Sequence, residues 1–71
     1  MYGVTPKQKR CLDYIKSYIA DNGYPPTTRE IQAGLGLSST SPVHAMVHRL
    51  RERGAIDFMD GRARSIEVRV D

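Results

Sequence analysis

The chain has 71 residues, of which 39% are hydrophobic and 27% charged, and its formal net charge is +3. This length has room for one domain with a small core, which we place over residues 1–71. No apolar run approaches the roughly 18 residues that cross a bilayer, and no secretory signal pattern is present, so we expect a cytoplasmic protein without membrane contact. A single cysteine, Cys11, excludes an internal disulfide and fits a reducing compartment.

The first expected element is a helix that begins after Thr5 and ends at Asn22-Gly23. Thr5 can cap the helix, Pro6 suits its first turn, and Gln8 stands three positions after Thr5, as a capping box requires. Asparagine and glycine tolerate the left-handed conformation found just beyond a helix, and residues 25–26, both proline, prevent it from resuming. Apolar residues recur at helical spacing along one stripe: Cys11, Leu12, Ile15, Tyr18 and Ile19.

A second, shorter helix is expected directly after the two prolines. Thr27 and Glu30 form another capping box, and the apolar residues Ile31 and Leu35 continue the helical pattern. Gly36 stops this helix, and the polar residues that follow predict a tight turn.

The third expected helix starts in that turn and is closed by Gly54. Its cap is either Ser39 or Ser41, with Pro42 in the first turn, where the amide hydrogens have no helical partners in any case. Its apolar stripe consists of Val43, Met46, Val47 and Leu50.

The last stretch changes to the period of a β-strand. Residues 56–58 and 66–70 alternate apolar with polar side chains, as half-buried strands do. The turn between them contains Asp60-Gly61, a strong hairpin signal, with Arg62 and Arg64 near its tip. The predicted fold class is therefore mainly α with a small β-hairpin (α+β): three helices followed by two strands.

Positive charge gathers in the second half of the chain. No acidic residue lies between Glu30 and Glu52, whereas Arg49 and Arg51 stand in that interval and further arginines follow it. A solvated basic face would explain such a distribution equally well. The positive net charge favours an anionic partner but does not identify one.

Several short motifs resemble one known family. They are residues 23–27 (Gly-Tyr-Pro-Pro-Thr), Glu30-Ile31, residues 35–39 (Leu-Gly-Leu-Ser-Ser), residues 41–44 (Ser-Pro-Val-His), Leu50 and residues 53–56 (Arg-Gly-Ala-Ile). From about Thr5 to Val68, without a gap, the chain resembles the N-terminal DNA-binding domain of LexA-type repressors of the SOS response. The resemblance implies a winged helix-turn-helix fold, bacterial or phage origin, and repression from a palindromic operator as a homodimer.

Such repressors continue into a self-cleaving peptidase domain that this chain does not contain. Two interpretations are open: an excised fragment of a longer repressor, or a free-standing small regulator.

One face of the third helix is the expected reader of DNA bases. Because successive residues turn by about 100°, the side opposite the apolar stripe is small, polar and basic, which suits a major groove. In helix-turn-helix proteins, the N-terminal part of this helix meets the base edges. The candidates are Ser39, Ser41, Pro42, His44, Ala45 and His48.

Contacts to phosphate would position the domain without reading sequence. Four to six such contacts would make affinity fall as about the fourth to fifth power of salt concentration. The candidates are Lys7, Arg29, Arg49, Arg51, Arg53, Arg62 and Arg64.

Other interpretations of these residues are weaker. His44 and His48 stand four apart, but only Glu52 could add a third ligand, so no metal is expected. Cys11 lies on the buried stripe and is expected to be a core thiol. Tyr14 and Tyr18 are expected to pack rather than stack on single strands, and Tyr2 lies in a terminus, where order is commonly poor.

No acid-base pair in a plausible pocket points to catalysis, and we expect no cofactor or small-molecule ligand. The rival function is a protein-interaction module that modulates a full-length repressor or another regulator. An exposed apolar patch would favour this rival, whereas a basic hairpin and an acid-free third helix favour double-stranded DNA.

Overall fold

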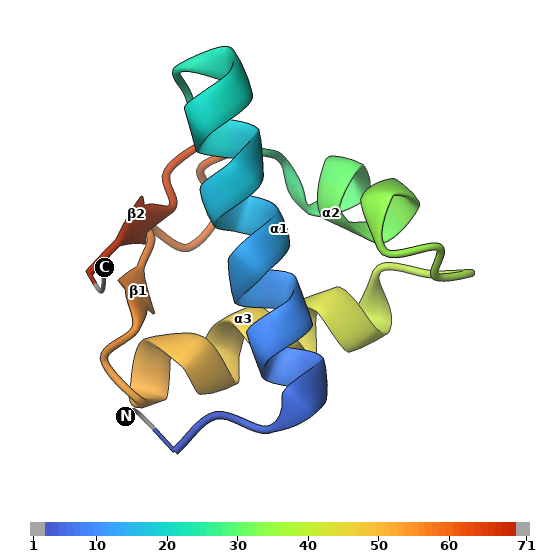
Figure 1. Ribbon diagram of the computed structural model, residues 1–71, viewed down its shortest axis with the longest axis vertical. Helices are drawn as coiled ribbons and strands as arrows, with labels where there is room; N and C mark the ends of the chain where they lie inside the picture. Colours follow the sequence, from blue (N-terminus) through green and yellow to red (C-terminus); the bar gives the residue numbers. More distant parts are fainter. Residues whose placement is uncertain (1–2, 70–71) are drawn as a thin grey trace.

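The computed structural model describes residues 3–69, so Tyr2 and Val70 lie outside the described residues. Its elements in chain order are α1 (Pro6–Asn22), α2 (Thr28–Gly34), α3 (Ser41–Glu52), β1 (Ile56–Asp57) and β2 (Glu67–Val68). Figure 1 shows α1 standing in front of α3, with α2 on one side of it and the hairpin on the other. The expected class, mainly α with a small β-hairpin, is confirmed.

Both predicted capping boxes are present. The Thr5 hydroxyl accepts from the Gln8 amide at 3.2 Å, and the Gln8 side chain accepts from the Thr5 amide at 3.1 Å. Thr27 and Glu30 repeat this arrangement at 3.2 and 2.8 Å. The first helix ends where predicted, because Gly23 adopts a left-handed φ of 80°. Local sequence signals therefore fix both ends of α1 and the start of α2.

The start of α3 corrects a prediction. The cap is Thr40, not Ser39 or Ser41, and no side chain caps the helix. Thr40 has helical backbone angles rather than the extended ones from which a hydroxyl reaches back to the first amides. Pro42 removes one of the donors that a cap would satisfy, since proline has no amide hydrogen.

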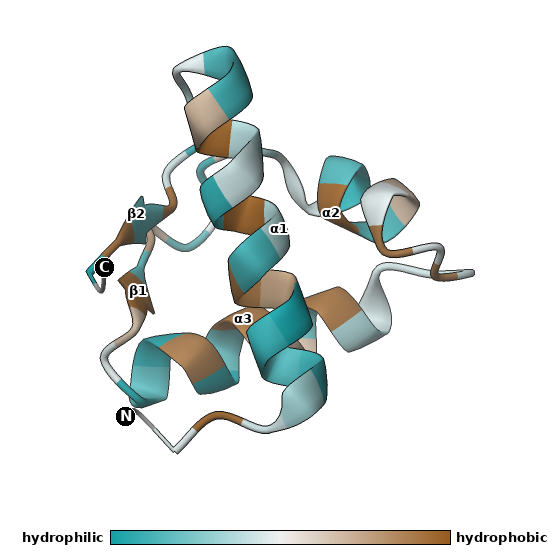
Figure 2. Cartoon of the chain, in the orientation of Figure 1, coloured by the Kyte–Doolittle hydropathy of each residue, from teal (hydrophilic) through white to brown (hydrophobic). Residues whose placement is uncertain are grey.

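The core lies where the three helices and the first strand meet. Figure 2 shows hydrophobic and hydrophilic bands alternating along α1 and α3, as in amphipathic helices. No polar or charged residue within positions 3–69 is buried, so apolar burial is the main force that holds the helices together. The core residues are Cys11, Leu12, Ile15, Ile31, Val43, Val47, Leu50, Ala55 and Ile56.

The hairpin is shorter than the sequence predicts. Its antiparallel ladder pairs only Ile56 with Val68 and Asp57 with Glu67, whereas strands were expected over 56–58 and 66–70. The Ser65 hydroxyl accepts from the Met59 amide at 2.9 Å, the place where a strand partner would otherwise bond. A side chain thus replaces the backbone ladder beyond Asp57, and residues 58–66, which we call the wing, form an irregular loop.

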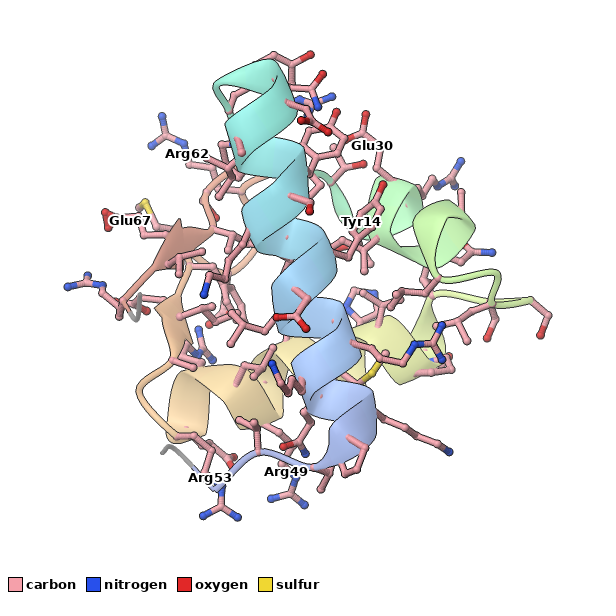
Figure 3. The ribbon with its side chains drawn as sticks, viewed as in Figure 1. Tyr14, Glu30, Arg49, Arg53, Arg62 and Glu67 are labelled. Carbon is pink, nitrogen blue, oxygen red and sulfur yellow. The ribbon has the colours of Figure 1, made fainter. Side chains whose placement is uncertain are left out.

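A close approach joins α1 to α2. The backbone of Gly34 lies against the ring of Tyr14, and a Cβ at position 34 would overlap that ring and come within 2.6 Å of its hydroxyl oxygen. Figure 3 shows Tyr14 extending from α1 toward α2. Tyr14 therefore packs between the two helices, as predicted.

Candidate nucleic-acid interface

The two sides of α3 differ as the sequence predicts. Val43, Val47 and Leu50 are buried on one side, and Met46 is half-buried beside them. The other side presents small or polar side chains that are all exposed, and the preceding turn exposes Ser39 as well. Small side chains would let the helix backbone approach a flat surface closely. The exposed base-reading candidates on the helix are Ser41, Pro42, His44, Ala45 and His48.

A groove of about 500 Å³ runs between the start of α2, the exposed side of α3 and the wing. We call it the wing groove. Thr27 and Thr28 form part of its α2 wall, and Phe58 and Ile66 stand at the two ends of the wing wall. The groove brings together side chains that are far apart in sequence, and five of them are predicted DNA contacts: Arg29, His44, His48, Arg62 and Arg64.

A second groove, of about 390 Å³, lies on the other flank of α3. Pro42 and Ala45 line it together with Lys7 from α1, so it joins three more predicted contacts. Arg10 also lines this groove, and sequence reasoning missed it. The signal was available, because Arg10 follows Lys7 by one helical turn and therefore shares its face of α1.

The seven phosphate candidates fall into two groups. Within residues 3–69, no carboxylate lies at ion-pair distance from Lys7, Arg29, Arg53 or Arg62. Figure 3 shows Arg53 projecting from the end of α3 and Arg62 projecting outward from the wing. The three candidates that do have a carboxylate partner are Arg49, Arg51 and Arg64.

Arg49 and Arg51 hold their partners differently. Arg49 pairs with Glu52 at 3.1 Å, and both side chains are more than 60% exposed, so the pair is weak and readily exchanged. Arg51 is held toward the hairpin, because its guanidinium lies 4.1 Å above the Phe58 ring and pairs with Asp60 at 3.3 Å. Arg51 thus contributes to packing of the wing against α3.

Arg64 has the most contacts of the basic residues. It binds both carboxylate oxygens of Glu30, at 2.9 and 3.0 Å, and donates to the Pro25 carbonyl at 3.0 Å. The hydrogen bond from Arg64, together with that from the Thr27 amide, lowers the pKa of Glu30 to about 2. The side chain of Arg62, two residues away, makes one long contact within residues 3–69, to the Met59 sulfur at 4.0 Å.

The surroundings of Cys11, His44 and His48 indicate neither a reactive thiol nor a metal site. Cys11 is fully buried, and burial raises the pKa of its thiol to about 11, so it is the expected core thiol rather than a nucleophile. His44 and His48 belong to no group of three metal-ligating side chains among residues 3–69. No helix in this range is long and apolar enough to cross a membrane.

Exposed apolar surface is sparse. Among the described residues, the large hydrophobic side chains left exposed are Tyr24 and Met59. Tyr24 is in turn covered in part, since its ring packs edge-on to Tyr18 and lies 4.7 Å from the Arg64 guanidinium. This surface does not favour a protein-interaction module over a nucleic-acid interface.

Two helices joined by a tight turn, an exposed face on the second of them, and a basic hairpin beside it together define a winged helix-turn-helix DNA-binding domain. The family model of the LexA DNA binding domain matches residues 1–65, and the chain belongs to this family.

Curated relatives agree with this assignment. The chain is 45% identical over 62 residues to the LexA repressor of Limosilactobacillus reuteri, covering 87% of this chain and 30% of that protein. It is 45% identical over 65 residues to that of Pelotomaculum thermopropionicum (92% of this chain, 32% of that protein) and 41% identical over 68 residues to that of Saccharophagus degradans (96% and 34%). The chain thus spans about a third of the length of these relatives.

Proposed function

We propose that the domain binds double-stranded DNA with α3 in the major groove and the wing against the sugar-phosphate backbone, and that it acts in transcriptional repression. The observation that carries the proposal is the exposed, small-residue side of α3, which has a groove with basic side chains on each flank. An α-helix with such a side fits the major groove, which is about 12 Å wide. The proposal assigns the domain no catalytic step.

The base readers in this proposal lie at the start of α3 and in the turn before it. A serine hydroxyl can donate or accept, a histidine can donate to the N7 or O6 of guanine, and Pro42 or Ala45 can pack on a thymine methyl group. None of these is a bidentate reader, so specificity is shared with DNA shape. The proposed set is Ser39, Ser41, Pro42, His44, Ala45 and His48.

Of the seven phosphate candidates, the proposed contacts are those without a firm internal partner, which leaves out Arg51 and Arg64. Arg49 is included, because its pair with Glu52 is exposed. Five contacts would give a slope of about −4.5 for log affinity against log salt concentration. The set is Lys7, Arg29, Arg49, Arg53 and Arg62.

A single domain measures 26 × 25 × 23 Å, less than one turn of duplex DNA, which is about 34 Å long. These dimensions support the proposal that one domain covers one half-site. We propose that tight binding uses two copies on a palindromic operator whose half-sites lie about one helical turn, or a multiple of it, apart.

Selection from random duplexes tests this proposal most directly. The wild-type domain should enrich a consensus that contains one or two half-sites, and His44→Ala should change the preference at one base pair of each half-site. Lys9→Ala is the matched control, because it removes an exposed charge paired with Asp13 on α1 without touching α3 or either groove. Selection that enriches no sequence, with no duplex binding at low salt, would contradict the proposal.

A further inference from the structure

Arg64 and Glu30 join two segments that are separated by more than thirty positions. Arg64 belongs to the wing, and Glu30 lies in the first turn of α2, so their two hydrogen bonds run from one wall of the wing groove to the helix that forms the other. A bidentate pair of this kind fixes direction as well as distance. The Pro25 carbonyl and the Tyr18 hydroxyl accept from the same guanidinium, at 3.0 and 3.4 Å.

Glu30 has two roles at once. One carboxylate oxygen accepts both from Arg64 and from the amide of Thr27, at 2.9 and 2.8 Å. The wing is thereby tied to the capping box of α2, whose Thr27 lines the groove near Arg29. Any shift of Arg64 therefore changes the position of the wing relative to the start of α2.

The wing needs such an attachment. Its ladder has two residue pairs, and a hairpin of that length has little stability of its own. In addition, Arg64 has a left-handed φ of 55°, a conformation that residues with a Cβ rarely adopt. Tertiary contacts must hold a residue in such a conformation, and the contacts present are the hydrogen bonds with Glu30, Pro25 and Tyr18 and the approach to the Tyr24 ring.

We propose that Arg64 is a positioning residue for DNA binding. Through Glu30 it sets the distance between the wing and α2, so that Arg62 reaches a backbone phosphate, while Arg64 itself binds no phosphate. This inference rests on the proposed function. The competing account has Arg64 leaving Glu30 on the complex and contacting phosphate directly, as the spacing of the two arginines in the sequence would suggest.

Three substitutions separate the two accounts. Glu30→Gln removes the charge that pairs with Arg64 but keeps the capping box, which accepts glutamine as readily as glutamate. Arg64→Lys keeps a positive charge that can bind phosphate but loses the planar fork that matches a carboxylate. Arg64→Ala removes both. Arg62→Ala is the reference for a direct phosphate contact, and Lys9→Ala is the control for loss of a charge elsewhere.

Affinity for one selected duplex is measured by fluorescence anisotropy over a series of salt concentrations. We expect Arg64→Ala, Arg64→Lys and Glu30→Gln each to weaken binding several-fold and to reduce the magnitude of the salt slope, because each displaces Arg62 from its phosphate. Arg62→Ala should reduce the magnitude of the slope by about 0.9. The double variant Arg64→Ala with Glu30→Gln should bind no more weakly than the weaker single variant, because both substitutions break the same contact.

The opposite pattern overturns the inference. If Arg64 contacts phosphate, Arg64→Lys should retain most of the affinity and the salt slope of wild type, and Glu30→Gln should bind as tightly as wild type or more tightly, with an unchanged slope.

Amide spectra of the free domains give a readout that does not depend on DNA. Arg64→Lys and Glu30→Gln should shift the same amides in the wing and near Thr27, and unshifted wing amides would overturn the positioning role. A wild-type domain that binds no duplex would instead contradict the proposed function. In that case the amide spectra would still show whether the pair of Arg64 with Glu30 positions the wing.

Discussion

The helical part of the molecule and the wing are held in place by different forces. The helices meet over nine buried hydrophobic residues with no buried polar group among residues 3–69. The wing packs on that core through Phe58 and Ile66 at its two ends, and between them it is held by hydrogen bonds and ion pairs of partly exposed side chains. Apolar burial involves no charges that salt could screen and no group that titrates, but exposed ion pairs are screened by salt. The helices should therefore keep their arrangement under conditions that loosen the wing, and the wing is the adjustable part of the interface.

Truncation of a core side chain should have the largest effect. Leu50 on α3 is fully buried, and Leu50→Ala should lower the free energy of unfolding by about 2–5 kcal/mol in a urea titration. A domain of this size has only about 5 kcal/mol in total, so a loss at the upper end of that range would unfold about half of the variant and reduce duplex binding in proportion. A loss of well under 1 kcal/mol would show that apolar burial does not dominate the helical part.

Gly34→Ala should have the next largest effect. It should lower the free energy of unfolding, whereas a change from glycine to alanine in a helix usually raises it. Alanine normally stabilises a helix relative to glycine, but here the added Cβ would overlap the Tyr14 ring, so a loss of about 1–3 kcal/mol is expected. In a Tyr14→Ala background the ring is absent, and Gly34→Ala should become neutral or stabilising. The measurement is urea unfolding of the wild type and the three variants of this cycle. The packing argument would be contradicted if Gly34→Ala changed the free energy of unfolding with the same sign in both backgrounds.

Ser65→Ala should act on the wing with little effect on the helices. The Ser65 hydroxyl accepts from the Met59 amide and lies within donating distance of the Met59 and Arg62 carbonyls, at 3.2 and 2.9 Å. Loss of these bonds should cost about 1 kcal/mol, and amide exchange should accelerate in residues 58–66 but not in α1. Equal acceleration in α1 would mean that the wing and the helices open as one unit.

The smallest effect on stability is expected when acid protonates the Glu30 carboxylate. The folded state lowers the pKa of Glu30 to about 2 from the ordinary value of 4.5, so the stability contributed by its carboxylate is fully present above pH 4.5. That contribution should disappear as the pH falls from about 4.5 toward 2. The difference in Tm between wild type and Glu30→Gln should shrink over the same range, and the Glu30 carboxyl carbon should titrate near pH 2 by NMR. A midpoint near 4.5 would mean that the pair with Arg64 is not formed in solution.

The sequence predicts most of the helical part because its signals are local. The capping boxes at Thr5 and Thr27 and the glycine at position 23 each act within a few residues of where they stand, and all three were located correctly. The cap of α3 was not located correctly. Several adjacent residues carry hydroxyl groups there, and the path of the chain into the helix determines which of them occupies the cap position. The strands were predicted too long, because nothing local shows that the Ser65 hydroxyl replaces their ladder.

The candidate site also has a part that the local sequence predicts and a part that it does not. The exposed side of α3 follows from helical period alone, and the structure agrees with it. Arg62 and Arg64 look equivalent in the sequence, but the partner of Arg64 is Glu30, more than thirty positions earlier. That contact exists only once the hairpin has folded back onto α2, so no local pattern could distinguish the two arginines.

The burial of Cys11 gives the domain a natural reporter of its own opening. Its thiol is inaccessible in the folded state and has its pKa raised to about 11, so reagents that modify thiolates should react with it only when α1 separates from the other helices. The rate of modification then measures how often the whole domain opens, with no engineered label. Because Cys11 is the sole cysteine of the chain, a single mass increment would count the opened molecules directly.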